Sequence, residues 1–337
     1  MPLQIGVLIL SRITWFGLIL SLAVGVQAES YVNHPDYPAF VQKMTTEHGF
    51  DKAQLDQIFV AAERKDSILA AISRPAERTL TWGEYRKIFL TPQRVAGGLT
   101  FWNRHRSALE RAAQKFGVPP EIIVAIIGVE TRYGGNMGSY RVVDALATLG
   151  FDYPPRAKFF LGELEHYLLL TREQGFDPLH LKGSYAGAMG LGQFIPSSYR
   201  AYAFDFDESG QADIWSNPVD AIGSVANYFS MHGWKQNQPV TQLASPKPVV
   251  DDSVTNTSLK PALNAEQLIS AGLNVPEDGG EGELYTAMKL ETDDGIEYWL
   301  GRHNFYVITR YNHSRLYAMA VYQLSQEIAA AMAAGEA

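Results

Sequence analysis

The 337-residue sequence contains no cysteine. Disulfide frameworks, thiolate metal sites and cysteine nucleophiles are therefore excluded, and so is a lipoprotein anchor, which requires an acylated cysteine. Basic residues are also few, because 28 Lys and Arg face 36 Asp and Glu, for a net charge of −8. A nucleic-acid-binding protein needs a basic surface, so no nucleic-acid partner is expected. Neither a His-Glu-x-x-His zinc motif nor a Gly-x-Ser-x-Gly nucleophile motif occurs.

Charge is almost absent from the N-terminal segment. Arg12 is the only charged residue before Glu29, and an apolar run over 13–26 ends at Val26-Gln27-Ala28, a small-residue cleavage pattern. The run fits a signal peptide better than a membrane-spanning helix of about 20 apolar residues. We predict a signal peptide over residues 1–28 and a periplasmic protein, with membrane association if the segment is retained. A buried or uncleaved N-terminal helix is the alternative.

The apolar residues, 46% of the chain, follow mainly helical spacing. Period-2 segments at 284–290 and 296–300 instead predict strands within a small β-containing insertion. The fold class predicted is therefore mainly α. After the helical N-terminal pattern of 31–74 and a connector with a short helix, further helices are expected at about 93–116, 119–133, 141–149, 156–174, 196–203, 217–232 and 316–334.

One carboxylate stands out in the helix expected over 119–133. Glu130 is the only acidic residue between Glu121 and Asp144, and it follows a run with almost no polar face, as in a central core helix. Burial disfavours the charged form and raises the pKa of a carboxyl group above about 4.3. Such a group can protonate a glycosidic oxygen. From the local pattern alone, an ion pair with Arg132 or another arginine is the alternative.

Two loops are candidate binding segments. Residues 182–192 are rich in glycine, which allows close approach of the backbone to a ligand or another chain. This segment is either a tight packing loop or a sugar-binding wall in which Ser184 and Gln193 supply hydrogen bonds. Residues 205–213 have oxygen side chains at EF-hand positions 1, 3, 5 and 9 and glycine at position 6. They predict either a Ca2+ loop or a polar turn capping the next helix.

These segments together resemble the MltB-type lytic murein transglycosylases. The similarity covers about residues 31–330, in the family's order, and its motifs are Gly128 to Gly134, Gly183 to Ser198, Asp205 to Trp215, Pro218 to Ala221 and Tyr311 to Ser314. The resemblance implies a lysozyme-like helical core over 93–238 and 304–337. It also implies an N-terminal helical domain over 31–92 and a small β-containing insertion over 239–303.

The resemblance also implies the chemistry. The β-1,4 bond between N-acetylmuramic acid and N-acetylglucosamine is cleaved without water, which leaves a 1,6-anhydromuramoyl end, and Glu130 is the catalytic acid and then the base. Arg156 contacts the peptide or acyl part of the substrate, although family members often have two arginines where this chain has Pro155-Arg156. The implied substrate-binding residues are Tyr85, Arg156, Ser184, Gln193, Tyr228, Tyr311, Asn312 and Tyr317.

The resemblance further implies a structural Ca2+, with no cofactor for catalysis. Position 12 of the loop is Ser216 rather than glutamate, so Asp220 closes the site. The implied ligands are Asp205, Asp207, Ser209, Gln211 and Asp220. The implied partners are peptidoglycan glycan strands and, as a second class, cell-wall synthesis proteins, and a monomer is expected. Two other functions stay open: a hydrolytic, lysozyme-like muramidase and a non-catalytic peptidoglycan-binding protein.

Overall fold

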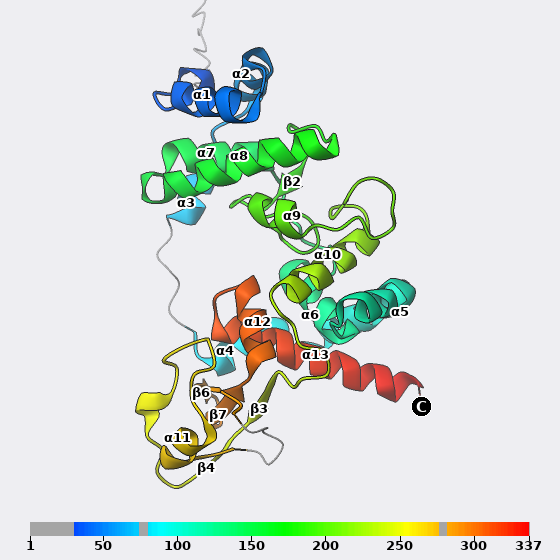
Figure 1. Cartoon of the computed structure of the whole chain (residues 1–337), viewed down its shortest axis with the longest axis vertical. Coiled ribbons are helices and arrows are strands. Elements are labelled where there is room, and N and C mark those ends of the chain that lie inside the picture. The colour runs from blue at the N-terminus through cyan, green and yellow to red at the C-terminus, as the bar shows by residue number, and fades with distance from the viewer. Residues whose placement is uncertain (1–29, 74–79, 276–281, 337) are drawn as a thin grey trace, which may run out of the picture.

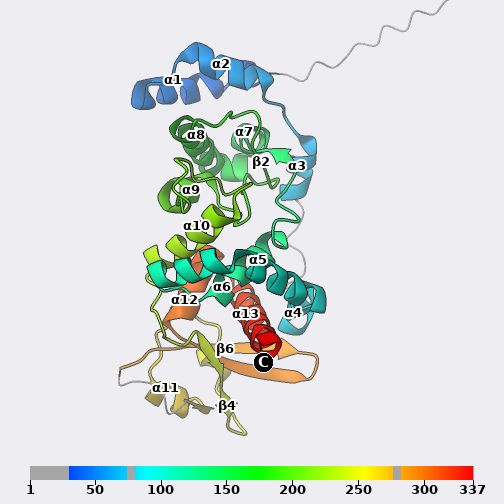
Figure 2. The ribbon, with the colours of Figure 1, turned by 90° about the vertical axis from the view of Figure 1, so that its right-hand side faces the viewer.

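The computed structural model describes residues 30–73, 80–275 and 282–336. The molecule is elongated, with α1 (Tyr37–His48) and α2 (Lys52–Ala61) at one end and a small β-containing unit at the other (Figures 1 and 2). Most of the described elements are helices, which confirms the mainly α prediction. The signal peptide predicted over residues 1–28 lies outside the described residues.

The first helical layer combines segments that are distant in the sequence. Its core includes Met44, Phe59, Leu146 and Tyr167, all fully or almost fully buried. The amide of Glu63 donates to the Asp144 carboxylate at 2.9 Å, which ties the N-terminal helices to this layer. Besides α1 and α2, the layer contains η1 (Tyr31–Asn33), α3 (Asp66–Ile72), α7 (Val142–Asp152), η2 (Pro154–Arg156), α8 (Ala157–Gln174) and α9 (Pro196–Tyr202).

The second helical layer surrounds α6 (Pro120–Thr131). Nine of the twelve residues of α6 are buried, which agrees with its apolar sequence and confirms a central core helix. Proline at its start and the chain reversal at its end set its length, because proline suits the first helical turn. The other helices of this layer are α4 (Trp82–Phe89), α5 (Pro92–Phe116), α10 (Pro218–Met231), α12 (His303–Tyr311) and α13 (Arg315–Glu336).

The β-containing unit lies below these helices in Figures 1 and 2. Its three-stranded antiparallel sheet has the order β3-β7-β6, and Met288 pairs with Trp299 in the hairpin formed by β6 and β7. Both predicted strand segments are confirmed. The elements are β3 (Thr241–Leu243), β4 (Ser245–Pro246), η3 (Asp252–Val254), α11 (Ala265–Ser270), β5 (Leu273–Asn274), β6 (Thr286–Thr292) and β7 (Gly295–Gly301). A separate short pair, β1 (Tyr140–Arg141) and β2 (Lys182–Gly183), joins the first layer.

The N-terminal region divides its packing between the two layers. Helices α1 to α3 pack into the core of the first layer, whereas α4 packs against α13 and β6. The domain boundaries drawn from the sequence stay a prediction. Among the described residues, no single helix is long and apolar enough to cross a membrane. Helices α5 and α6 reach that length and composition only as a pair, across a bend of 114°.

Candidate active site

Glu130 lies in the last turn of α6, where the chain reverses sharply. Arg132 and Tyr133 both have positive φ, 52° and 60°, and the Tyr133 amide donates back to the Ile127 carbonyl at 3.3 Å. This backward bond satisfies a carbonyl at the helix end, as in other left-handed helix caps. Two consecutive non-glycine residues in this region are uncommon, so the surrounding structure has to hold them.

The ring of Tyr133 supplies that support by filling a space left by three glycines. A Cβ at Gly128 would lie 2.6 Å from the Tyr133 hydroxyl oxygen, so no larger residue fits without a shift. The Tyr133 hydroxyl donates to the Arg94 carbonyl at 2.7 Å, and the Arg94 guanidinium donates to the Gly128 carbonyl. These contacts fix the end of α6 and so orient Glu130. The glycines involved are Gly97, Gly98 and Gly128.

The electrostatics of Glu130 favour a carboxyl group that is protonated near neutral pH. Burial raises its pKa to about 7, and the hydrogen bond from Tyr317 partly opposes this rise. The Tyr317 hydroxyl donates to Glu130 Oε1 at 2.5 Å, and burial keeps the pKa of Tyr317 well above 10, so this donor stays protonated. The charge of Glu130 also contributes, after burial, to the raised pKa values of Tyr85 and Tyr311.

A pH profile should report this environment. Because the acid form donates the proton, kcat/KM on sacculi is expected to fall as pH rises through about 7. Tyr317→Phe removes the bond that lowers the Glu130 pKa, so the falling limb should move to higher pH in this variant. Initial rates of sacculus solubilisation between pH 4 and pH 9 (about half-unit steps) measure both curves. If the falling limb of the pH profile stays at the same pH in Tyr317→Phe, the group that titrates is not Glu130.

The glycine-rich segment lies directly beside the end of α6. The Thr131 hydroxyl donates to the Leu191 carbonyl at 2.9 Å, and the Tyr311 hydroxyl donates to the Gly192 carbonyl at 2.5 Å. Gly190 has φ 67°, and a Cβ there would lie 2.5 Å from the Ile214 carbonyl oxygen. The segment is therefore a tightly packed loop, one of the two interpretations of its sequence, and this packing brings it next to Glu130.

Ser184 and Gln193 are engaged within this loop. The Ser184 hydroxyl accepts from the Ala188 amide at 3.0 Å, and Gln193 Nε2 donates to the Gly190 carbonyl at 2.9 Å and more weakly to the Met137 carbonyl at 3.3 Å. Gln193 also has φ 51°. Each side chain keeps unused hydrogen-bonding capacity, the Ser184 proton and the Gln193 carbonyl oxygen. The loop thus fixes the positions of the groups that the sequence predicted to bind sugar.

The remaining predicted binding residues differ in exposure, because Tyr228 is buried whereas Asn312 and Arg156 are exposed. The Tyr228 ring packs 4.8 Å from the Tyr311 ring, and its hydroxyl donates to the Arg310 carbonyl at 2.6 Å. Asn312 is exposed at the end of α12. Arg156 is exposed on η2, with its guanidinium 4.3 Å from the centre of the Phe159 ring. No hydrogen bond or ion pair among the described residues links Arg156 to Glu130.

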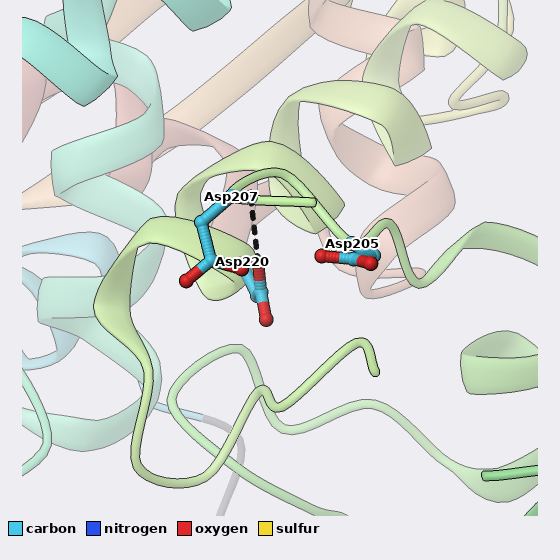
Figure 3. A group of neighbouring side chains, drawn as sticks. All are labelled: Asp205, Asp207 and Asp220. Carbon is cyan, nitrogen blue, oxygen red and sulfur yellow. Dashed lines mark hydrogen bonds between the residues drawn. The ribbon is translucent and has the colours of Figure 1, made fainter. Parts of the chain in front are cut away.

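A second candidate site is formed by three carboxylates. One oxygen from each of Asp205, Asp207 and Asp220 lies within 4.8 Å of the others. Figure 3 shows Asp207 and Asp220 joined by a hydrogen bond from the Asp207 amide, with Asp205 beside them. Like charges this close repel each other unless a cation or protons compensate them. Burial raises the pKa of Asp220, whereas hydrogen bonds from Ser209 and Asn217 lower that of Asp207.

The other predicted calcium ligands adjoin this cluster. The Ser209 amide donates to Asp205 at 3.0 Å, and the Ser209 hydroxyl donates to the Gln211 carbonyl at 3.2 Å. The side chain of Asp213, at EF-hand position 9, instead accepts from the Trp215 amide at 2.9 Å. Oxygen donors of this hard type suit Ca2+. The arrangement therefore fits a divalent cation held by a loop between α9 and α10.

Comparison with known proteins decides the family. Residues 33–326 match the family described as transglycosylase SLT domain. The chain belongs to this family. As an SLT-domain transglycosylase, it is a lytic enzyme that acts on peptidoglycan, as the resemblance in its sequence implied.

Relatives of this SLT-domain transglycosylase match over nearly their full length. The membrane-bound lytic murein transglycosylase B of Escherichia coli (strain K12) is 48% identical over 310 residues, 89% of this chain and 84% of the relative. The soluble lytic transglycosylase SltB1 from Pseudomonas aeruginosa is 55% identical, with a TM-score of 0.84 over 88% of this chain and 98% of its own. The Escherichia coli lytic transglycosylase Slt35 in complex with calcium is 48% identical, with a TM-score of 0.83 over 89% and 95%.

Proposed function

We propose that the protein cleaves the β-1,4 bond between N-acetylmuramic acid and N-acetylglucosamine and leaves a 1,6-anhydromuramoyl end. Glu130 serves as the acid and then as the base. The supporting observation is a single partly buried carboxyl group with a pKa raised to about 7 and a tyrosine hydroxyl bonded to one of its oxygens. A carboxyl group with this pKa can both give up and recover a proton near neutral pH.

The proposed reaction uses one protein carboxylate twice. Protonated Glu130 donates to the bridging oxygen as the bond to C1 breaks, and the N-acetyl group of the substrate stabilises the positive charge at C1. The Glu130 anion then removes the proton from the C6 hydroxyl, whose oxygen bonds to C1. Among the described residues, no second carboxylate contributes to the pKa of Glu130, in line with an intramolecular nucleophile.

Aromatic and polar side chains around Glu130 are proposed to bind the glycan. Tyr85, Tyr311 and Tyr317 lie within electrostatic range of the carboxyl group; the partly exposed Tyr85 and Tyr311 offer apolar faces for sugar rings, whereas the buried Tyr317 acts through its hydroxyl. Gln193 and Ser184 face the substrate from the loop, Asn312 and Arg156 extend the surface, and the buried Tyr228 supports the Tyr311 ring. A more distant relative, SltB3 from Pseudomonas aeruginosa, 31% identical with a TM-score of 0.78, was crystallised in complex with NAG-anhNAM-pentapeptide. Peptidoglycan strands are therefore the proposed partner.

The carboxylate cluster is proposed to hold a structural Ca2+. Asp205, Asp207 and Asp220 would supply carboxylate oxygens, and Ser209 and Gln211 would complete the set. The calcium complex of Slt35 supports this choice of ion. The ion would compensate the repulsion among the carboxylates and hold the loop that leads into α10, and it would supply no chemistry to the cleavage.

Export is the proposed route to the substrate. Residues 1–28 have the composition of a signal peptide, and a relative that is 48% identical is named membrane-bound. Peptidoglycan lies outside the cytoplasmic membrane, so an enzyme that acts on it has to cross that membrane.

The mass of the released fragments tests the reaction. Digestion of purified sacculi is expected to release muropeptides with anhydro ends, each lighter by one water than the product of a hydrolase. Reducing ends would favour the muramidase instead, with water in place of the C6 hydroxyl. No release at all would favour a binding protein. Mass spectrometry before and after borohydride reduction distinguishes the two ends, because only reducing ends gain hydrogen.

A further inference from the structure

A cavity of about 470 Å3 lies beside the candidate active site, between the start of α4, strand β6 and the turn that precedes α13. Trp82 lines it from α4 and Arg315 from α13. Both helices continue directly to residues near the catalytic carboxyl group. The Tyr85 ring is 6.5 Å from that of Trp82, and Tyr317, two residues after Arg315, donates to Glu130. Two residues of the cavity wall, Trp82 and Arg315, therefore lie within one helical turn along the chain of residues that neighbour Glu130.

Arg315, in the wall of this cavity, has a guanidinium group whose hydrogen-bonding capacity is only partly satisfied. One terminal nitrogen, Nη2, donates to the Asn256 carbonyl at 2.8 Å, while Nε is buried without a hydrogen-bond partner. No carboxylate among the described residues lies within ion-pair distance of its guanidinium. Burial lowers the pKa of Arg315, as expected for a charge that lacks a counter-ion. Arg315 is only partly buried, but charges withdrawn from water are usually paired in proteins, so its guanidinium can gain from an anionic ligand.

The other charges of the cavity restrict the kind of anion. Lys289 is already paired with Asp252, and Glu291 on the same strand also lines the cavity. His313, exposed in the turn that precedes α13, also lines the cavity and adds a hydrogen-bond donor. A polymer with many negative charges would be repelled by Glu291. A peptide that places only its terminal carboxylate beside Arg315 and keeps its other charges outside the cavity meets no such penalty.

We propose that this cavity binds the terminal carboxylate of the stem peptide on the muramoyl residue being cleaved, with Arg315 as the counter-ion and His313 as a second donor. The proposal rests on the cleavage proposed at Glu130, which places a peptide-bearing sugar in the cleft. An extended peptide spans up to about 3.3–3.6 Å per residue, so a five-residue stem can reach about 17 Å from its sugar. That reach is several times the rise of one helical turn, about 5.4 Å, and Trp82 lies within one such turn of Tyr85 along α4.

The test compares two substrates made from the same sacculi: intact strands with peptides, and strands stripped of peptides by an amidase. The quantity measured is the ratio of kcat/KM on the two substrates. Arg315→Gln should lower this ratio about tenfold, since a hydrogen bond to a charged group contributes on that order. Arg315→Lys should restore part of it, and His313→Ala should lower it less. Arg104→Gln, an exposed arginine of α5, serves as the matched control and should keep the ratio.

A binding measurement separates this proposal from the chemistry at Glu130. Free stem pentapeptide and its C-terminal amide are titrated into the wild-type enzyme by NMR, and weaker binding of the amide is expected. An equal loss of kcat/KM on both substrates in Arg315→Gln would assign Arg315 to support of Tyr317 alone and overturn the proposal. Equal binding of acid and amide would overturn it as well. Neither outcome depends on whether Glu130 is the acid.

Discussion

Replacing Glu130 with glutamine is expected to lower kcat on sacculi by about 10²–10⁴-fold, the usual effect of losing general acid–base catalysis. The amide has nearly the same shape and can still accept the hydrogen bond from Tyr317. It cannot donate a proton to the bridging oxygen or recover one from the C6 hydroxyl. The fold and the affinity for glycan should therefore remain while the reaction is lost.

The matched control for this variant is Glu121→Gln, at the other end of α6. Burial also raises the pKa of Glu121, but this residue lies in the first helical turn, away from Tyr317. Release of soluble fragments from sacculi measures activity, and co-sedimentation with sacculi measures binding. Activity in Glu130→Gln close to that of Glu121→Gln would remove Glu130 from the mechanism.

Replacing Asp220 with alanine is expected to destabilise the protein by about 3–5 kcal/mol, because several buried donors lose their acceptor at once. Asp220 is fully buried, and its carboxylate accepts from the amides of Phe206 at 2.8 Å, Asp213 at 2.9 Å and Asp207 at 3.3 Å. A loss of this size should lower Tm by about 10 °C in a chain of this length. Thermal melting followed by circular dichroism measures the effect.

Melting with calcium or with EDTA separates the two roles of Asp220. If the loop holds Ca2+, the ion should raise the Tm of the wild type and leave that of Asp220→Ala unchanged, since a ligand stabilises only the state that binds it. The difference between the two proteins should persist in EDTA, because the hydrogen bonds do not need the ion. If calcium does not change the Tm of the wild type, the metal site is refuted, while the role of Asp220 as a hydrogen-bond acceptor remains.

The sequence predicted most of the helices and the two long strands because their apolar periods are regular, but α11 and α12 were not predicted. Helix α6 was recognised as central from its lack of a polar face, and the partly buried position of Glu130 followed from that. The grouping of the helices could not be predicted. Helices α1 to α3 share a core with α7 and α8 while α4 joins α13, and these pairings depend on contacts between distant segments.

In the candidate site, too, features set by neighbouring residues could be predicted, whereas contacts between distant segments could not. The motif around Glu130 indicated an acid, but the arginine alternative was excluded only by structure, because Tyr317 rather than an arginine bonds Glu130. Support by Arg94 and Tyr133 was missed altogether. Glycine at 97, 98 and 128 was the one available signal, and it has meaning only once α5 and α6 are seen to cross. The bonds within the 183–194 loop were likewise invisible, because they depend on its turns.

The hydrogen bond that accompanies the acid joins residues 187 positions apart. Tyr317 belongs to the last helix, so a ribosome has released almost the whole polypeptide before this bond can form. Partly synthesised or C-terminally clipped chains lack the tyrosine, and their Glu130 has neither its partner nor the covering α13. The acid of a peptidoglycan-cleaving enzyme thus reaches its final hydrogen-bonded and buried environment only when synthesis and folding are both complete.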